Sequence, residues 1–250
     1  MSIEFNGINP SASMEITRMA KQLKEKGKKI FTLSIGDTHF PPPKEISNKL
    51  SRLPPEYSHY TDATGINQLR VQIAAVEQGY EKSDVLLVPG LKQGIFYVLS
   101  ALQNKKLCVL EPAWLGYRAT AIVTNYKYIS INSYQSGWLN DLRSTSFDVL
   151  ILCIPNNPDG KIISVEEIKL ILEVARKNQA WVIADLIYNY FCYEGNFHDT
   201  YQELQKYEKL VIGKGFSKSH GVTGFRIGYL LCKDRELINR ILLLQQSLAT

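Results

Sequence analysis

Short apolar segments alternate with helix-like segments from residue 84 onward, and this alternation limits the possible fold more than any other feature of the sequence. Seven segments have the length and composition of strands: Val85–Val88, Leu107–Glu111, Tyr128–Ile131, Phe147–Ile154, Trp181–Ala184, Leu210–Ile212 and Ile227–Cys232. Short apolar strands that are separated by helices are typical of a mainly parallel sheet with both faces covered. The sequence therefore predicts an α/β fold with a mainly parallel, seven-stranded sheet covered by helices.

The helix signals lie between and before these segments. Ser164 and Glu167 have the spacing of a capping box, and apolar residues follow them at helical spacing. Residues 13–26 have the pattern of an amphipathic helix that stops at Gly27, and a short strand is predicted over residues 30–35. At 250 residues, the chain is long enough for a sizeable core.

Polar features follow the predicted strands, at the edge where ligands bind in sheets of this kind. Gly90 lies between a strand and a helix, so the N–H groups of Leu91 and Lys92 and the positive end of the helix suit an anion. Asp185 closes a buried strand, where a carboxylate is costly unless a cation lies beside it. These positions predict an anion site and a cationic partner for Asp185.

The segment Gly213–Tyr229 holds a lysine and an arginine among several glycines. Lys218 follows an apolar strand, and a lysine in such a pocket can lose its proton and attack a carbonyl group. Arg226 offers a planar fork that suits a phosphate. A phosphorylated aldehyde would satisfy both side chains, and pyridoxal phosphate is the obvious one. The alternative interpretation is a basic, glycine-rich surface loop.

Several segments, in the same order along the chain, resemble motifs of one family. They are Tyr60-x4-Gly-x3-Leu-Arg70, Gly90-x-Lys-Gln93, Pro155-Asn-Asn-Pro-Asp-Gly160, Asp185-x-x-Tyr188 and Ser217-Lys-x4-Thr-Gly-Phe-Arg-Ile-Gly-Tyr229. This set resembles the class I/II aminotransferases, which are fold-type I enzymes that depend on pyridoxal 5'-phosphate. The resemblance covers essentially the whole chain.

The resemblance implies how the cofactor is held. Lys218 would form a Schiff base with the cofactor aldehyde and then move the proton during catalysis. Ser217, Arg226 and the backbone at Gly90, Leu91 and Lys92 would hold the phosphate. These last three residues form the start of the helix already predicted to bind an anion.

The resemblance also implies contacts with the cofactor ring. Asp185 would keep the ring nitrogen protonated, so that the ring accepts electrons from the substrate. Asn157 and Tyr188 would bond the phenolic oxygen, with Tyr188 grouped with Lys218 and Asp185 as catalytic. Trp114 would stack on the ring, although in isolation it would be interpreted as core. The bond between Asn157 and Pro158 would be cis.

Substrate and subunit contacts follow from the same resemblance. Gly36 and Asn157 would contact the substrate, and Tyr60 would reach the cofactor phosphate of a neighbouring subunit. Without the resemblance, a tyrosine that packs before a helix is nearly as good an explanation of Tyr60. The resemblance therefore implies a homodimer with shared active sites.

The implied domain organisation has two parts in this chain. Residues 1–45 would contribute to a small domain, and residues 46–250 would form the cofactor-binding large domain. Relatives continue into a C-terminal small domain, which carries an arginine for the substrate carboxylate. We expect that domain to be missing from this chain, so that the chain alone binds the cofactor but transaminates poorly.

The implied function is transfer of an amino group between an L-amino acid and a 2-keto acid. Two alternatives remain open. One is a pyridoxal-phosphate-dependent lyase for β- or γ-elimination, and the other is a non-catalytic truncated homologue that acts in binding or assembly. The presence of Lys218, Asp185 and Arg226 together argues against the second alternative.

Charge and cysteine content limit the partners, metals and cellular location that can be expected for the protein. The net charge of +5 is mild, and the basic and acidic residues are interspersed, so nucleic acid is not implied as a partner. The four cysteines show no Cys-x-x-Cys pair and no metal-ligand spacing. The sequence has no signal segment and no apolar run long enough to span a membrane. We expect a cytoplasmic protein without a metal.

Overall fold

The computed structural model describes residues 12–31, 36–52, 59–103, 105–193 and 197–248. One sheet with the strand order β1-β7-β6-β5-β4-β2-β3 forms its centre. The strands are β1 Val85–Val88, β2 Lys106–Glu111, β3 Lys127–Asn132, β4 Val149–Cys153, β5 Trp181–Asp185, β6 Leu210–Gly215 and β7 Gly228–Cys232. Only β7 runs against the others, antiparallel to both β1 and β6. The predicted fold class and all seven strands are confirmed.

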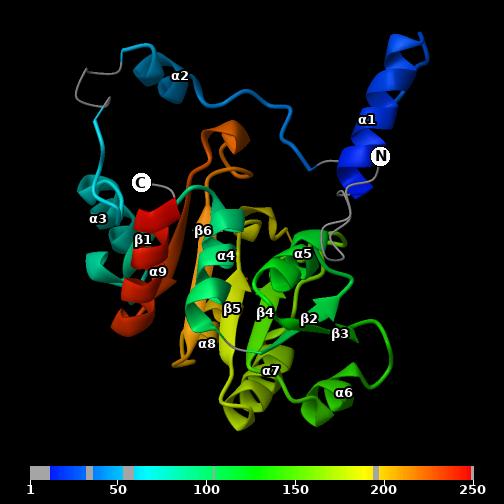
Figure 1. Cartoon of the computed structure of the whole chain (residues 1–250), viewed down its shortest axis with the longest axis vertical. Coiled ribbons are helices and arrows are strands. Elements are labelled where there is room, and N and C mark those ends of the chain that lie inside the picture. Colours follow the sequence, from blue (N-terminus) through cyan, green and yellow to red (C-terminus); the bar gives the residue numbers. More distant parts are fainter. Residues whose placement is uncertain (1–11, 32–35, 53–58, 104, 194–196, 249–250) are drawn as a thin grey trace.

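Helices cover the sheet, and further helices lie in the N-terminal part of the chain, before the first strand (Figure 1). The α-helices are α1 Ala12–Glu25, α2 Lys44–Leu50, α3 Asn67–Val76, α4 Leu91–Leu102, α5 Leu115–Val123, α6 Trp138–Ser144, α7 Val165–Lys177, α8 Phe197–Leu204 and α9 Arg235–Leu248. Short 3-10 turns are η2 Lys82–Asp84, η3 Asn189–Phe191 and η4 Thr223–Phe225. The predicted capping box is present at the start of α7, where Ser164 Oγ accepts from the Glu167 N–H at 3.2 Å. The helix predicted over 13–26 is confirmed as α1, whereas the strand predicted over 30–35 is not formed at Ile30 and Phe31. Its other residues, 32–35, lie outside the described part.

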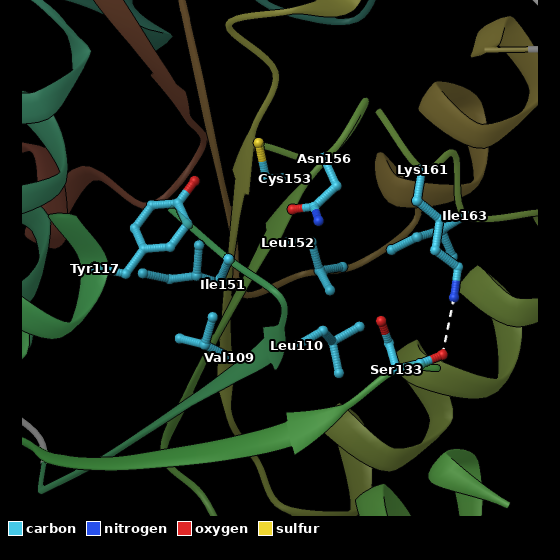
Figure 2. A pocket seen from close by; sticks show the side chains of 11 residues that line it. Val109, Leu110, Tyr117, Ser133, Ile151, Leu152, Cys153, Asn156, Lys161 and Ile163 are labelled. Atoms are coloured by element: carbon cyan, nitrogen blue, oxygen red, sulfur yellow. Dashed lines mark hydrogen bonds between the residues drawn. The ribbon is translucent and has the colours of Figure 1, made fainter. Parts of the chain in front are cut away.

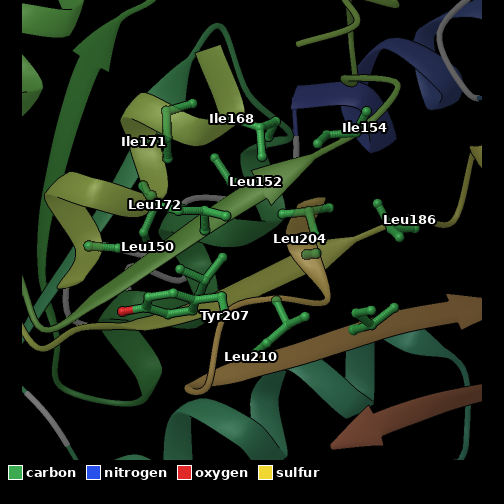
Figure 3. Close-up of a cluster of buried hydrophobic side chains, with 14 of the residues drawn as sticks. Leu150, Leu152, Ile154, Ile168, Ile171, Leu172, Leu186, Leu204, Tyr207 and Leu210 are labelled. Atoms are coloured by element: carbon green, nitrogen blue, oxygen red, sulfur yellow. The ribbon is translucent and has the colours of Figure 1, made fainter. Parts of the chain in front are cut away.

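Side chains that alternate along the strands build a core on each face of the sheet. On β4, Leu150 and Leu152 pack into the cluster with Ile168 and Ile171 of α7, as Figure 3 shows. Val149 and Ile151 belong instead to the opposite cluster, with residues of α4, α5 and α9. Because each buried aliphatic side chain stabilises the fold by about 1.5–3 kcal/mol, two such clusters hold the strand ends rigidly in place.

The N-terminal helices lie outside this layered body. In Figure 1, α1 and α2 stand apart from the sheet, and α2 contains no buried residue. On α1, Met14, Ile16 and Met19 are exposed, so the apolar face predicted from the sequence is present without a covering core. Among the described helices, none has the length and apolar composition needed to cross a membrane.

Candidate active site

The predicted site residues converge on one edge of the sheet. Gly90 follows β1, Asn157 follows β4, Asp185 ends β5 and Lys218 follows β6. Arg226 precedes β7, and because β7 runs in the opposite direction, its start lies at the same edge. The topology thus gathers residues from four separate stretches of sequence, as expected where ligands bind parallel sheets.

An anion-binding cradle lies where α4 begins. Gly90 adopts φ of 80°, and a Cβ atom built there would lie 2.4 Å from Nη2 of Arg226. At Gly228, a Cβ atom would lie 2.8 Å from the backbone nitrogen of Leu91. The two glycines therefore let a guanidinium group and a second strand approach the helix start, where free N–H groups and the helix dipole attract anions. Leu91 and Lys92 supply the first of these N–H groups, since the helical bonds back to Gly90 begin with Gln93.

The segments that carry the arginine and the lysine are tied together. Arg226 has φ of 55°, in the left-handed region, and its Nη1 donates to the carbonyl oxygen of Thr223 at 3.0 Å. The Thr223 hydroxyl donates in turn to the carbonyl oxygen of Ser217 at 2.9 Å. Ser217 is buried next to Lys218. These bonds fix the position of Arg226 relative to Lys218.

Lys218 lies against the N-terminal segment of the protein. Its Nζ donates a hydrogen bond to the carbonyl oxygen of Gly36, 182 positions earlier in the sequence. Burial lowers the pKa of Lys218, and the nearby charge of Arg226 acts in the same direction, whereas Asp37 opposes both. A lower pKa raises the fraction of unprotonated amine, which is the form that attacks an aldehyde.

Asp185 is a buried carboxylate that has no cationic neighbour among the described residues. It is 5% exposed, and burial raises its pKa to about 6, although two hydrogen bonds act against this shift. Tyr117 donates to Oδ2 at 2.6 Å, and the Ile187 N–H donates to Oδ1 at 3.2 Å. None of the ion pairs formed by the described residues involves Asp185. A cationic group of a ligand would therefore complete this position.

Asn157 and Tyr188 are hydrogen-bonded to each other. The Asn157 side-chain amide donates to the Tyr188 hydroxyl at 3.2 Å, and burial raises the pKa of Tyr188 to about 12. Asn156 anchors the turn by donating to the carbonyl oxygen of Pro112 at 2.8 Å. The pair thus brings one amide and one hydroxyl group together from the turn after β4 and the loop after β5.

The predicted cis bond at Pro158 is wrong. The cis bonds lie before Pro112 and before Pro155 instead. An X–Pro bond favours trans by only about 0.5–1 kcal/mol, so the packing around each proline decides its isomer.

Trp114 lies at the rim of the site. It precedes α5 and is half-buried, with the edge of its ring system against Tyr117 at a centroid distance of 5.2 Å and an angle of 89°. The ammonium group of Lys92 lies 5.8 Å from the centre of the Trp114 ring. A partly exposed aromatic face beside the helix start suits a stacked ring better than it suits the core.

One residue of the candidate site, Tyr117, was not predicted from the sequence, and one predicted residue, Tyr60, contributes no contact to the site among the described residues of this chain. Tyr117 contacts Asp185, and its only sequence signal was its place one helical turn after Trp114. Tyr60 is 96% exposed in this chain, which argues against a packing role before α3. Within the described ranges, no cluster of three or more His, Cys, Asp or Glu side chains could hold a metal ion.

A pocket lies behind this edge, between the ends of β2 and β4 (Figure 2). It is lined by Tyr117, Cys153, Asn156 and Lys161 together with aliphatic side chains, and Lys161 Nζ donates to the carbonyl oxygen of Ser133 at 3.0 Å. Figure 2 shows Tyr117 beside Ile151, on the side of the pocket away from Lys161. The pocket therefore adjoins the site without containing Lys218 or Arg226.

The fold and this edge define the class of protein. The sequence model of the family "Aminotransferase class I and II" matches residues 28–250, and the chain belongs to this family. The cofactor of the family is pyridoxal 5'-phosphate, as the motif resemblance implied. The described residues fit that group, because they offer a primary amine, an arginine at a helix start, an uncompensated carboxylate and a partly exposed aromatic ring.

Individual relatives carry different substrate names. The chain is 31% identical to a (5-formylfuran-3-yl)methyl phosphate transaminase of Methanocaldococcus jannaschii, over 94% of this chain and 64% of that protein. It is 28% identical to an aspartate aminotransferase of Thermotoga maritima, over 94% of this chain and 66% of the relative. The chain thus spans less than two thirds of the length of these curated relatives.

Solved structures confirm the fold. The crystal structure of an aspartate aminotransferase from Thermotoga maritima superimposes with a TM-score of 0.89 at 25% identity, covering 97% of this chain and 68% of that one. An aspartate aminotransferase from Thermus thermophilus with maleate gives a TM-score of 0.87 at 23% identity, over 97% and 67% of the two chains. The second likeness concerns the fold alone.

Proposed function

We propose that the protein is a pyridoxal-phosphate-dependent aminotransferase that transfers an amino group between an L-amino acid and a 2-keto acid. The observation that carries this proposal is the convergence of Lys218, Arg226 and Asp185 on one edge of the sheet. The three side chains match the aldehyde, the phosphate and the ring nitrogen of the cofactor. Residues 1–45 would belong to a small domain and residues 46–250 to the cofactor-binding large domain.

The residues of this chain would divide the binding of the cofactor among them. Arg226, Ser217 and the N–H groups that follow Gly90 would hold the phosphate. Asp185 would pair with the ring nitrogen, Asn157 and Tyr188 would bond the phenolic oxygen, and Trp114 would cover the ring. When bound, the cofactor supplies an aldehyde that captures amines and a ring that accepts electrons from the substrate.

Lys218 would do the proton transfer. Its lowered pKa places part of the amine in the unprotonated form, which can accept a proton from the substrate α-carbon at Nζ. The resulting ammonium can return the proton as an acid. The carbonyl group of Gly36, which accepts a hydrogen bond from Nζ, would hold the amine in place while its charge changes.

The substrate would lie between the N-terminal segment and the turn after β4. Gly36 lies beside Lys218, so its backbone would contact the substrate on one side. The Asn157 amide would contact it on the other. This placement orients the α-carbon toward the lysine, and orientation of this kind accounts for much of enzymatic rate enhancement.

Trapping the cofactor tests the proposal. The 250-residue chain is mixed with pyridoxal phosphate, reduced with borohydride, digested and mapped by mass spectrometry. We expect the fixed cofactor on Lys218. Attachment to Lys92 or Lys214 instead, or no attachment at all, would refute the proposed role of Lys218. In a separate sample that is not reduced, addition of single amino acids distinguishes transamination from elimination, because elimination releases a keto acid and ammonia without an acceptor.

We also propose a two-fold homodimer in the cytoplasm, with each site completed by Tyr60 of the partner subunit. The 96% exposure of Tyr60 supports this proposal, because an exposed tyrosine can contact another chain. Mixing a Tyr60→Phe chain with a Lys218→Ala chain should restore activity that each variant lacks, since one hybrid site then holds both native residues. Exchange of subunits without any recovery would contradict the shared site.

A further inference from the structure

Tyr117 is placed to control the Asp185 carboxylate. It lies in the first turn of α5, is 1% exposed, and donates to Asp185 Oδ2 at 2.6 Å. The other carboxylate oxygen accepts from the Ile187 N–H at 3.2 Å. Each oxygen thus has one fixed donor, and the plane of the carboxylate is defined from two directions. Each oxygen has the lone-pair capacity to accept a further hydrogen bond.

The other groups around Asp185 carry no charge near neutral pH. Cys153 faces it from β4, Tyr188 faces it from the loop after β5, and the neighbouring position on β6 is Gly213. Burial raises the pKa of Tyr117 and of Cys153 well above their ordinary values, and that of Tyr188 to about 12. Asp185 therefore meets neutral neighbours from every described element that packs against it.

We propose that Tyr117 is a positioning residue for the cofactor ring, whose hydroxyl group holds and keeps ionised the Asp185 carboxylate without supplying a counter-charge. The proposal rests on the proposed function. A neutral donor favours the carboxylate over the carboxylic acid, because the hydrogen bond to a charged acceptor is the stronger one. It does not cancel the negative charge, as a lysine or arginine would. The charge stays available for the protonated ring nitrogen.

The same turn of helix couples this carboxylate to the aromatic wall of the site. Trp114 precedes α5 and packs edge-on against the Tyr117 ring. The residue that would cover the cofactor and the residue that holds Asp185 are therefore on one rigid element, backed by the buried cluster that contains Tyr117 and Ile151. Sites built on rigid elements keep their groups in register more accurately than sites on loops.

Titration of Asp185 in the cofactor-free chain tests this inference. Carbon-13-labelled aspartate shows the carboxyl signals by NMR, and the signal that Asp185→Asn removes belongs to Asp185. We expect a midpoint near pH 6 in the parent chain, as burial imposes. Tyr117→Phe should raise this midpoint by about one to two pH units, because the donor to the ionised form is lost. An unchanged or lower midpoint would overturn the proposal.

Tyr207→Phe is the matched control. Tyr207 is also buried and donates at 2.6 Å, but to the backbone carbonyl of Ala180 on the other face of the sheet. It should reduce stability in the same way while the Asp185 midpoint stays unchanged. A shift of the same size in Tyr207→Phe would show a general loosening and would overturn the specific role of Tyr117. If Tyr117→Phe does not fold, Tyr117→Met removes the same donor with a more adaptable side chain.

A second measurement addresses the ring itself. Pyridoxal phosphate labelled with nitrogen-15 in the ring reports ring protonation by its chemical shift in the bound state. We expect a protonated ring in the parent protein and partial loss of protonation at neutral pH in Tyr117→Phe. An unchanged shift would overturn the role of Tyr117 toward the cofactor. Failure of borohydride to fix the cofactor on Lys218 would instead overturn the proposed function, and the cofactor-free titration separates the two failures.

Discussion

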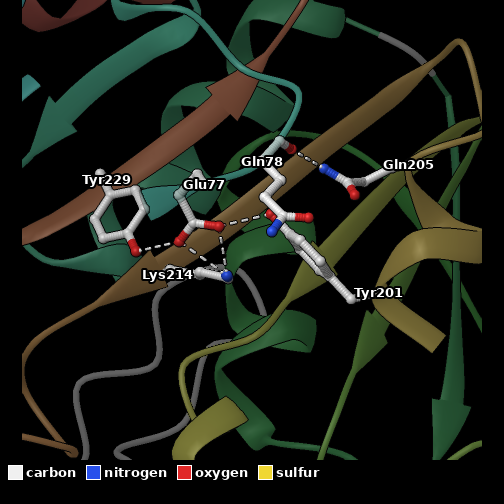
Figure 4. A network of polar contacts seen from close by, with 6 residues as sticks. All are labelled: Glu77, Gln78, Tyr201, Gln205, Lys214 and Tyr229. Carbon is white, nitrogen blue, oxygen red and sulfur yellow. Dashed lines mark hydrogen bonds and ion pairs between the residues drawn. The ribbon is translucent and has the colours of Figure 1, made fainter. Parts of the chain in front are cut away.

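Two buried carboxylates in this protein, Glu77 and Asp185, differ in whether a cation of the described chain balances their charge. Glu77, which follows α3, accepts hydrogen bonds from Lys214 at 2.9 and 2.8 Å, from Tyr201 at 2.6 Å and from Tyr229 at 2.8 Å, as Figure 4 shows. The ammonium group of Lys214 also lies 4.2 Å from the centre of the Tyr201 ring. We call these four residues the Glu77 cluster. Its charge and its hydrogen bonds are balanced within the chain.

Asp185, only one strand away from Lys214, receives two neutral donors and no cation from the described residues. At the surrounding edge, Gly90 and Gly228 let Arg226 and the start of β7 approach the start of α4 closely, with no Cβ atom between them. The comparison teaches that burial of a carboxylate is not itself a sign of function. A carboxylate whose charge is balanced internally ties elements together, whereas one left without a cation is, as we propose for Asp185, a candidate partner for a cationic ligand.

Removal of the cation from the Glu77 cluster should have the largest effect. Lys214→Met leaves a buried carboxylate without its counter-charge, and we expect the free energy of unfolding to fall by about 3–5 kcal/mol in urea denaturation. Lys206→Met is the control, because Lys206 pairs with Glu203 at 2.7 Å on the surface with 64% of its side chain exposed. The control should change stability by no more than about 1 kcal/mol.

A double variant shows whether charge balance is the reason. Glu77→Gln combined with Lys214→Met removes both charges. The glutamine oxygen can accept from one of the two tyrosines, Tyr201 or Tyr229, and its NH2 group can donate to the hydroxyl oxygen of the other. We expect it to recover at least half of the lost stability, because a paired charge can often be replaced at little cost. A loss of less than about 1 kcal/mol in Lys214→Met alone would show that Lys214 is not needed to balance the charge of Glu77. The contrast between Glu77 and Asp185 would then be wrong.

The stability of the cofactor-free chain should depend on pH through Asp185. Its pKa is about 6 in the folded chain against an ordinary 3.8, so the folded state binds more protons between these values. Stability is therefore highest below pH 4 for this group and falls by about 3 kcal/mol as pH rises through 6. Asp185→Asn should remove this fall and be the more stable chain at pH 8, as measured by denaturation from pH 4 to 8. Equal pH profiles of the two chains would mean that an internal cation already balances Asp185.

A methyl group added at the start of α4 should weaken the binding of the ligand. Gly90→Ala places a methyl group against the guanidinium of Arg226, so we expect pyridoxal phosphate to bind at least about tenfold more weakly in an absorbance titration. Gly137→Ala is the matched control, because Gly137 has φ of 82° but its Cβ would meet nothing nearer than 3.9 Å. Gly90→Ala carries the greater backbone strain, because Gly90 has ψ of 149° whereas Gly137 has ψ of 8° in the left-handed region, so the two affinities are compared under conditions in which denaturation shows both chains to be folded. Under those conditions, weaker binding by Gly90→Ala alone would sharpen the comparison. Equal affinities would place the phosphate elsewhere.

Local sequence pattern predicted the framework of this protein and the segments of its site. Val85–Val88 and Trp181–Ala184 are apolar over a strand length, and Ser164 with Glu167 starts α7 as a capping box does. These signals lie within a few residues of one another, so the chain carries them before it folds. The positions of Lys218 and Arg226 at the sheet edge follow from the same strands, because glycine-rich turns after buried strands lie at that edge.

The tertiary structure alone decided which polar groups meet. Glu77 and Lys214 are 137 positions apart, and Tyr117 and Asp185 are 68 apart, so no local pattern pairs them. In the sequence Lys214 stands as close to the predicted site as Lys218 does, yet its side chain faces the Glu77 cluster. Successive strand residues point to opposite faces, and the packing of α3 and α8 on one face determines which of them finds a partner. Only this packing distinguishes the Glu77 carboxylate, which is paired with Lys214, from the Asp185 carboxylate, which has no cation among the described residues.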